Sequence, residues 1–143
     1  LLRDRGIVLN HGITRRAKRQ EGRFQRMRPE HKLIAKYIFP GGELDDIGHT
    51  IAAMERAGFE VHDVEAWRLH YARTCRLWCE RLTAAREDAI ALVGEEKYRI
   101  WVAYLAGVSL AFSRGGARIF QTLASKTAKR PAPLPPTRAD LYR

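Results

Sequence analysis

The sequence has few cysteines and no long apolar run. Its 143 residues include two cysteines, Cys75 and Cys79, and nothing near the roughly 20 successive apolar residues that cross a bilayer. The first residues also lack the basic-then-apolar order of a secretion signal. We therefore expect no disulfide framework and no membrane span, and a reducing compartment such as the cytosol fits.

Motifs of common catalytic sites are missing as well. Cys75 and Cys79 have the spacing of one helix face, but no second Cys or His pair at ligand spacing accompanies them, so no metal site is expected. The glycine pairs at 41–42 and 115–116 belong to no G-x-G-x-x-G loop, and we expect no cofactor-binding residue in this chain. Nor does any set of Ser, His and Asp stand at a hydrolase spacing.

Positive charge is abundant and unevenly placed. The formal net charge is +10, and residues 3–36 hold eleven Lys or Arg against three acidic residues. Residues 126–143 hold five basic residues against one, which leaves the middle of the chain slightly negative. Such clusters attract the phosphates of lipid headgroups or of nucleic acids, or they only keep a loop soluble. Charge alone does not choose between these functions.

The first third of the chain predicts a strand, a loop and a short helix. Residues 6–9 are typical of a buried strand, and the polar residues 10–14 of the turn that ends it. An Arg-rich loop over residues 14–28 and a short helix around residues 33–38 follow. The strand has neither an initiator Met nor a partner strand before it, so we expect the chain to be the back half of an enzyme.

An amphipathic helix and a second strand come next. The helix is expected over residues 47–57, with Asp45 and Asp46 near its start, where carboxylates suit the helix dipole, and Gly58 at its C-terminal cap. Residues 59–67 then alternate as a strand does. The two predicted faces of that strand carry Phe59 with Val61, and Val64 with Ala66.

The second half predicts two helices, a final strand and a tail. One apolar stripe from Tyr71 to Leu92 predicts a single helix, and another from Trp101 to Phe112 predicts the next. Residues 117–125 are apolar on both faces, which favours a strand inside a sheet. We expect a folded domain over residues 1–126 and a disordered, Pro-rich and basic tail over residues 127–143. Strands separated by helices indicate an α/β fold.

Two residues stand out as candidates for a site. His11 follows the opening strand, where open α/β sheets place ligands, although a histidine there can also bond only to nearby backbone. Tyr71 begins the long apolar stripe, a position typical of a core tyrosine with its hydroxyl at the edge. The residue pattern alone leaves both roles open.

Four segments together resemble a known family, the cyclopropane-fatty-acyl-phospholipid synthases, which include the mycolic acid cyclopropane synthases. The resemblance is to the C-terminal half of these enzymes, covers about residues 5–126, and holds in order and spacing. The segments are LNHGIT from Leu9, YIFPGGEL from Tyr37, HYART from His70 with Leu77-Trp78, and FQTL from Phe120. Two departures, Asp45-Asp46 for Pro-Ser and Val108-Ser109 for Cys-Ala, lie away from the expected site.

The resemblance implies the last three strands and the helical insertions of a Rossmann-like, S-adenosylmethionine-dependent methyltransferase fold. It also implies methyl transfer from S-adenosylmethionine to a cis double bond of a phospholipid acyl chain, with bicarbonate as the base that takes up the proton. His11, the backbone of Ile13 and Tyr71 match the bicarbonate-binding residues of the family, and His11 and Tyr71 would be catalytic. The cofactor loop and the family's catalytic Cys and Glu would precede residue 1, so the chain alone would be inactive.

The implied partners are phospholipid acyl chains at an anionic membrane surface and, for a full-length member, a second copy of the same protein. The expected location is the cytoplasm, peripheral at the inner membrane face, with no nucleic acid bound. Two alternatives remain open: a small basic module that binds nucleic acid through residues 15–28, and a degenerate remnant without activity. Against the first, the aromatic residues lie on helical stripes and do not interleave with the basic residues.

Overall fold

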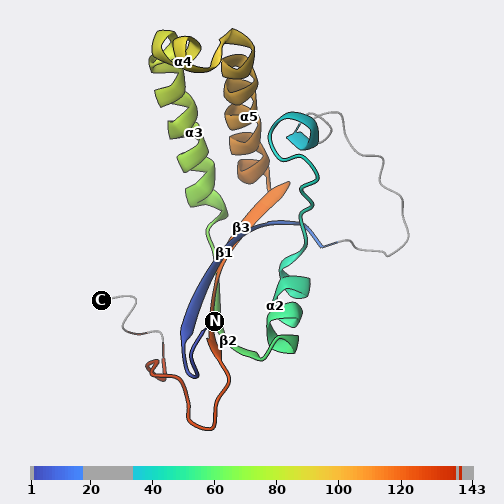
Figure 1. The fold of residues 1–143 in the computed structure, drawn as a ribbon, viewed down its shortest axis with the longest axis vertical. Helices are drawn as coiled ribbons and strands as arrows, with labels where there is room; N and C mark the ends of the chain where they lie inside the picture. Colours follow the sequence, from blue (N-terminus) through green and yellow to red (C-terminus); the bar gives the residue numbers. More distant parts are fainter. Residues whose placement is uncertain (1, 18–33, 138, 140–143) are drawn as a thin grey trace, which may run out of the picture.

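The computed structural model describes residues 2–17, 34–137 and 139. The predicted Arg-rich loop lies mostly outside these residues, as does the end of the tail. Figure 1 shows a mixed α/β arrangement, which confirms the expected fold class. In chain order the elements are β1 (Ile7–Arg15), α2 (Ile47–Arg56), β2 (Phe59–Ala66), α3 (Arg68–Ala84), α4 (Arg86–Val93), α5 (Glu95–Arg114) and β3 (Ala117–Lys126).

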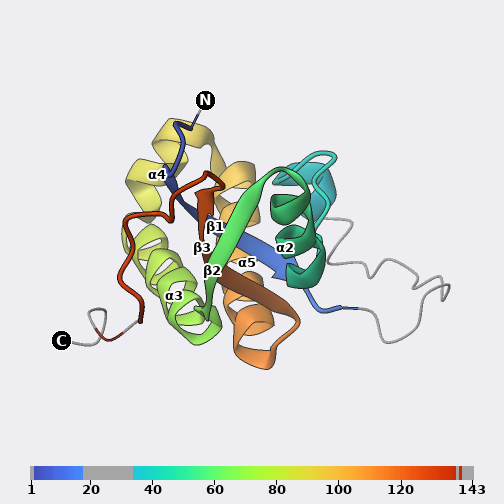
Figure 2. The same cartoon turned by 90° about the horizontal axis from the view of Figure 1, so that it is seen from below.

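The last strand, β3, is the centre of a three-stranded sheet. The strand order is β1-β3-β2, and both neighbours run antiparallel to β3. The interior position predicted from its two apolar faces is confirmed. Figure 2 shows α3 and α2 on either side of these strands.

The opening strand is longer and more exposed than the sequence suggests. β1 pairs with β3 at each position from Ile7, opposite Ser125, to Arg15, opposite Ala117. The prediction of a turn at residues 10–14 is therefore wrong. These polar residues are typical of a turn locally, but pairing with the distant strand β3 gives their backbone groups hydrogen-bond partners and keeps them extended. The prediction that this strand is buried is also wrong: Ile7 is 42% exposed and Leu9 is 57% exposed.

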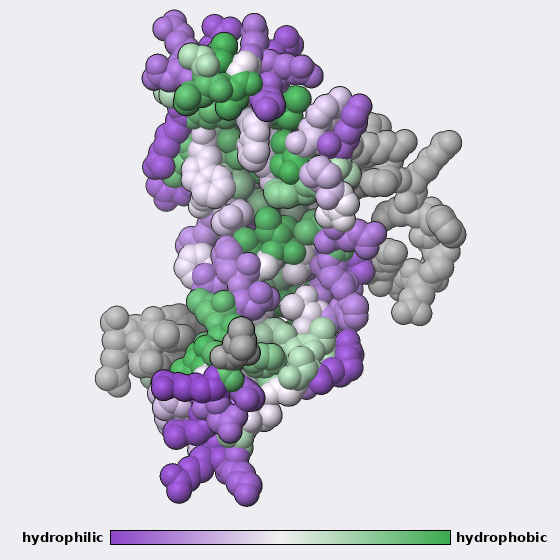
Figure 3. Space-filling view, viewed as in Figure 1, coloured by the Kyte–Doolittle hydropathy of each residue, from purple (hydrophilic) through white to green (hydrophobic). Residues whose placement is uncertain are grey.

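The outer edge of β1 has no partner strand among the described residues. Apolar surface gathers in Figure 3 over the part of the molecule where β1 runs in Figure 1, and the exposed side chains of Ile7 and Leu9 belong to this strand. Unpaired backbone groups beside apolar side chains make this edge a place where a further strand can pair.

A β-bulge changes the faces of β2. Val61 pairs with Ala124 and Asp63 with Leu123, so His62 is an extra residue in the strand. The bulge shifts the alternation of side chains by one position. The predicted division of the apolar residues between two faces is therefore wrong, because all four share the face turned toward α2. These residues are Phe59, Val61, Val64 and Ala66.

The helix boundaries near α2 are confirmed. The Asp46 carboxylate caps its N-terminus by accepting a hydrogen bond from the His49 amide at 3.1 Å. Gly58 follows the helix with a φ of +84°, a backbone conformation that favours glycine. Residues 34–37 are also helical, within the short helix expected around residues 33–38.

The single helix expected from Tyr71 to Leu92 is two helices. α3 ends at Ala84, Ala85 adopts a non-helical conformation (φ −97°, ψ 34°), and α4 begins at the next residue. The prediction failed because alanine is the best helix former, so nothing in the local sequence signals the break. Figure 1 shows α4 crossing the far end of the hairpin that α3 and α5 form.

The core lies where the base of this hairpin meets the sheet. Cys75, Phe112 and Ile119 form its buried centre. Two side-chain bonds fix the hairpin there: Arg68 donates to the carbonyls of Phe112 and Ser113 at 2.6 and 2.7 Å, and Ser109 donates to the Ala72 carbonyl at 2.8 Å. A guanidinium at the C-terminus of α5 also suits the dipole of that helix.

Candidate functional site

The three residues predicted for the site lie at this junction of sheet and hairpin. His11 and Ile13 are two positions apart in β1, so their side chains share one face of the sheet. Tyr71 lies in the first turn of α3, where its amide donates to the Trp67 carbonyl at 2.9 Å. The rings of His11 and Tyr71 have centroids 5.7 Å apart and planes inclined by 59°. Ile13 and Tyr71 both pack against the core cluster.

The backbone of Ile13 points to the free edge of the sheet. The carbonyl of Ile119, the residue opposite Ile13, accepts a hydrogen bond from the Trp67 amide at 3.0 Å on the β2 side. Because the N–H and C=O of one residue in an antiparallel strand point to the same side, Ile119 and Ile13 form a non-hydrogen-bonded pair. The Arg15 amide agrees, since it donates to the Asp45 carbonyl at 2.9 Å, away from β3. The Ile13 amide therefore also points away from β3.

Tyr71 stands at the centre of an aromatic group that the sequence analysis assigned only to helical stripes. Its ring makes edge contacts with Phe112, at a centroid distance of 5.3 Å, and with Trp78, at 6.0 Å. Burial raises the pKa of the Tyr71 hydroxyl, with a smaller contribution from the nearby Cys75 thiol. The hydroxyl therefore stays protonated at neutral pH and is available as a donor.

Neither polar side chain of the site has a partner in the described part of the protein. The structure gives the His11 ring and the Tyr71 hydroxyl no hydrogen bond there, and the His11 side chain is exposed. With the outward Ile13 amide, three hydrogen-bonding groups from two elements are left open on one side of the core. A small anion is the kind of ligand that such donors can hold.

A cavity that the sequence did not predict lies beside α5. Its volume is about 350 Å³. Tyr37 lines it from the short helix at 34–37, and α5 supplies the other residues. These are Glu96, Lys97, Ile100 and Trp101. The sequence places Tyr37 in a short helix and in the YIFPGGEL family motif, and Trp101 on a separate helical stripe, so no local signal joins the two.

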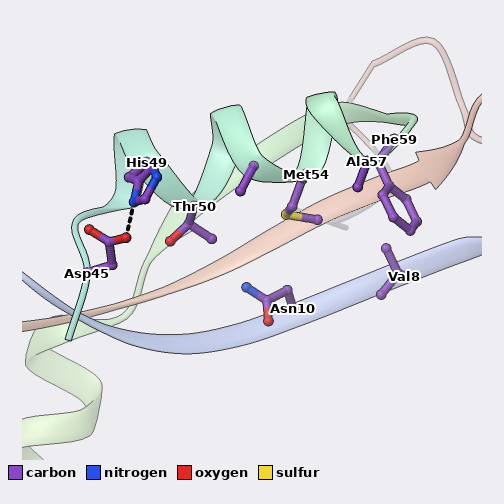
Figure 4. Close-up of a pocket in the computed structure, with 9 residues that line it drawn as sticks. Val8, Asn10, Asp45, His49, Thr50, Met54, Ala57 and Phe59 are labelled. Atoms are coloured by element: carbon purple, nitrogen blue, oxygen red, sulfur yellow. Dashed lines mark hydrogen bonds and ion pairs between the residues drawn. The ribbon is translucent and has the colours of Figure 1, made fainter. Parts of the chain in front are cut away.

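A more open groove of about 520 Å³ lies on the opposite face of the sheet and holds none of the predicted site residues. Figure 4 shows Val8 and Asn10 of β1 on one side and Met54 of α2 on the other. At one end His49 bonds to Asp45, which holds the pKa of that carboxyl below its usual range, assisted by the Asp46 amide and by the charge of nearby Arg15. This network ties the end of β1 to the start of α2.

Metal-binding geometry is absent from the described residues, which contain no cluster of three His, Cys, Asp or Glu side chains. Cys75 and Cys79 are both free thiols. Burial raises the pKa of the Cys75 thiol. No helix in the described part of the chain is long and apolar enough to cross a membrane.

The fold is that of an S-adenosylmethionine-dependent methyltransferase, represented by the final strands and the helices between them. A solved cyclopropane synthase, MmaA2 from Mycobacterium tuberculosis, superposes with a TM-score of 0.75 at 31% identity, over 85% of this chain and 44% of that one. The family model of mycolic acid cyclopropane synthetase matches residues 1–122. The chain belongs to this family.

Curated relatives are similar over most of the chain. A "Probable fatty acid methyltransferase" of Pseudomonas putida is 45% identical over 143 residues, which are 99% of this chain and 36% of the relative. The "S-adenosylmethionine-dependent methyltransferase UmaA" of Mycobacterium tuberculosis is 36% identical over 66% of this chain and 33% of the relative. The chain thus spans about a third of the length of these relatives.

Proposed function

We propose that this chain is part of an S-adenosylmethionine-dependent enzyme that transfers a methyl or methylene group to the cis double bond of a phospholipid acyl chain. Its contribution is one wall of the reaction site, formed by His11, Ile13 and Tyr71. One observation carries the proposal: the His11 and Tyr71 rings, from β1 and α3, lie 5.7 Å apart, and their polar atoms have no hydrogen-bond partner among the described residues. Names of the relatives, which include fatty acid methyltransferase and cyclopropane synthase, support the same chemistry for the whole protein.

The open donors suit bicarbonate, which when bound accepts the proton that leaves as the ring closes. The neutral Tyr71 hydroxyl, the His11 ring and the Ile13 amide would hold this anion and fix its orientation. Phe112 and Trp78 keep the surroundings of Tyr71 apolar.

The proposal leaves S-adenosylmethionine to residues beyond these 143. The chain has no Gly-rich loop after a strand that fits this cofactor. The free edge of β1 is where the sheet would continue toward such a loop. On this proposal the isolated chain lacks the methyl donor and does not turn over.

Methyl transfer from labelled S-adenosylmethionine to vesicles of unsaturated phospholipid tests the proposal. The isolated chain should transfer nothing. A chimera that carries this chain in place of the matching segment of the Pseudomonas putida relative should transfer label. Vesicles of saturated phospholipid are the matched control and should stay unlabelled. Transfer by the isolated chain, or equal labelling of saturated lipid, would contradict the proposal.

The lipid substrate also implies a place at a membrane surface. We propose that the protein works in the cytoplasm, attached peripherally to the inner membrane face, and that the positive charge of +10 on this chain contributes to the attachment. Flotation with anionic vesicles should fall steeply as salt is raised, because the attraction is electrostatic. Flotation that is independent of salt would contradict this mode of attachment.

A further inference from the structure

The cavity beside α5 is lined by aromatic and charged side chains. Tyr37 and Trp101 are aromatic, line the cavity and are about half exposed, so both side chains also reach the solvent. Two edge-on ring contacts brace this region: Trp101 with Tyr104, at a centroid distance of 5.6 Å, and Phe39 with Tyr104, at 6.0 Å. The cavity is therefore built from packed aromatic side chains of two separate segments, which Figure 1 shows side by side.

Two charged residues, Glu96 and Lys97, complete the cavity. Within the described residues Glu96 and Lys97 make no ion pair, whereas the neighbouring Glu95 pairs with Arg86 at 3.5 Å. An open carboxylate beside aromatic faces is suited to an alkylated ammonium group, whose diffuse charge is recognised by ring quadrupoles. An unpaired ammonium such as that of Lys97 is suited to a phosphate.

Tyr37 already shows the attraction of its ring for a cation. The Lys36 ammonium lies 4.9 Å from the centroid of this ring. A ligand cation would take the ring face that Lys36 leaves, with Trp101 and Glu96 completing its surroundings. The cavity thus has an acidic group, Glu96, that suits a cation and a basic group, Lys97, that suits an anion, on neighbouring residues of one helix.

We propose that this cavity binds the zwitterionic headgroup of a phospholipid, with its methylated ammonium against Tyr37, Trp101 and Glu96 and its phosphate toward Lys97. This inference rests on the proposed function, because it assigns a headgroup class to the phospholipid whose acyl chain reacts. It predicts a preference for phosphocholine-type headgroups that the overall positive charge of the protein does not explain.

The position of the cavity along α5 fits a lipid that reaches the reaction site. Trp101 precedes Phe112 by eleven residues on one helix, which is roughly 16 Å at 1.5 Å per residue. Phe112 contacts Tyr71, and Tyr104 lies between the two levels of the helix. A headgroup at Trp101 would therefore direct an acyl chain along α5 toward Tyr71.

Soluble phosphocholine is the first probe, and the indole N–H resonances of the 143-residue chain are the readout. The Trp101 signal should move on titration, while Trp67 and Trp78 serve as internal references. Trp101→Leu and Trp101→Phe lack this indole, so their binding is followed through the backbone amide signals of Lys97 and Ile100, which also line the cavity. Trp101→Leu should weaken binding roughly 3- to 30-fold, the range expected for losing one cation–π contact, and Trp101→Phe should retain most of it. Glu96→Gln should also weaken binding, whereas the control Glu95→Gln should not.

Vesicles then separate the headgroup from the charge of the surface. Trp101→Leu should reduce partitioning onto phosphatidylcholine vesicles and leave partitioning onto phosphatidylglycerol vesicles unchanged. The proposal is overturned if phosphocholine leaves the Trp101 signal in place, if glycerol phosphate moves it equally, or if Glu96→Gln behaves as Glu95→Gln does. Failure here with an active chimera refutes only the headgroup site, while headgroup binding with an inactive chimera refutes only the proposed reaction.

Discussion

His11 and Tyr71 meet ring to ring at 5.7 Å although one belongs to the first strand and the other to the first turn of α3. The contact depends on β1 continuing past residue 9, because the strand carries His11 up to the base of the α3–α5 hairpin. Arg68 and Ser109 hold that hairpin in place through bonds to backbone carbonyls. The geometry of the proposed site is thus set by the packing of the whole junction.

Bicarbonate removal is the first test of this geometry in the chimera. If the open donors hold this anion, transfer should fall when bicarbonate is stripped from the buffer and return when it is added. Tyr71→Phe should reduce that response, because the phenol is one of the proposed ligands. Turnover that is indifferent to bicarbonate would refute the assigned base and leave the fold assignment untouched.

The two thiols should differ in reactivity. Cys75 is 2% exposed and its burial raises the thiol pKa, so little thiolate forms near neutral pH. Cys79 is partly exposed on the same helix. Iodoacetamide should therefore modify Cys79 at least about tenfold faster than Cys75 in the folded chain. Mass spectrometry measures the two rates. Equal rates of modification of the two thiols in the folded chain would contradict the burial of Cys75. In urea, where both thiols are exposed, their rates should become similar.

Phe112 should be the most sensitive position of the core. Its side chain is fully buried against Cys75 and Ile119, so Phe112→Ala should lower the free energy of unfolding by about 3–5 kcal/mol. Leu92, which is 84% exposed, provides the control, and Leu92→Ala should change it by less than about 0.5 kcal/mol. Urea unfolding measures both. Similar values for the two variants would contradict the placement of the core.

The bulge in β2 makes a prediction for the stability of a variant that lacks His62. Removing His62 would leave a regular strand in which the other pairings with β3, and the shared face of the four apolar residues, are unchanged. His62→Ala only removes the hydrogen bond to the buried Ser125 hydroxyl, 2.7 Å long, and should lower the free energy of unfolding by about 1–3 kcal/mol. The deletion loses the same hydrogen bond but keeps the register, so its effect on the free energy of unfolding should be close to that of His62→Ala. A deletion that abolishes folding while His62→Ala folds normally would argue against the bulge.

Asp45 should contribute stability at neutral pH that is lost in acid. The His49 hydrogen bond lowers the pKa of Asp45 in the folded state, so its stabilisation is present above the ordinary carboxyl pKa of about 4 and disappears as the pH falls through the lower folded value. The difference in stability between wild type and Asp45→Asn should therefore shrink as the pH is lowered from 7 to 3. In a His49→Ala background it should already be small at pH 7.

Local sequence signals predicted most element boundaries. The Asp46 cap and Gly58 mark the two ends of α2 because their preferences arise from backbone groups within one turn. The two apolar faces of β3 likewise predicted its central position. Such features depend on neighbours in the chain, which a sequence displays directly.

Features set by distant partners were missed. The continuation of β1 and the bulge at His62 are decided by pairing with β3, and after the break at Ala85 the helix α4 packs against α5, which lies further along the chain. His11, Ile13 and Tyr71 were found through a family resemblance, and the residue pattern alone left them ambiguous. The α5 cavity was missed because Tyr37 and Trp101 belong to separate segments that only tertiary packing brings together.

The most direct test of the central claim is the rate of methyl transfer by the active chimera with the site residues replaced. Tyr71→Phe and His11→Ala should each lower the rate about 100-fold, the effect expected for losing one donor to a charged centre. Two controls should keep the rate within about twofold of the parent: Tyr98→Phe, at a buried tyrosine of α5, and His49→Ala, on the opposite face of the sheet. Rates for Tyr71→Phe and His11→Ala equal to those of these controls would contradict the account.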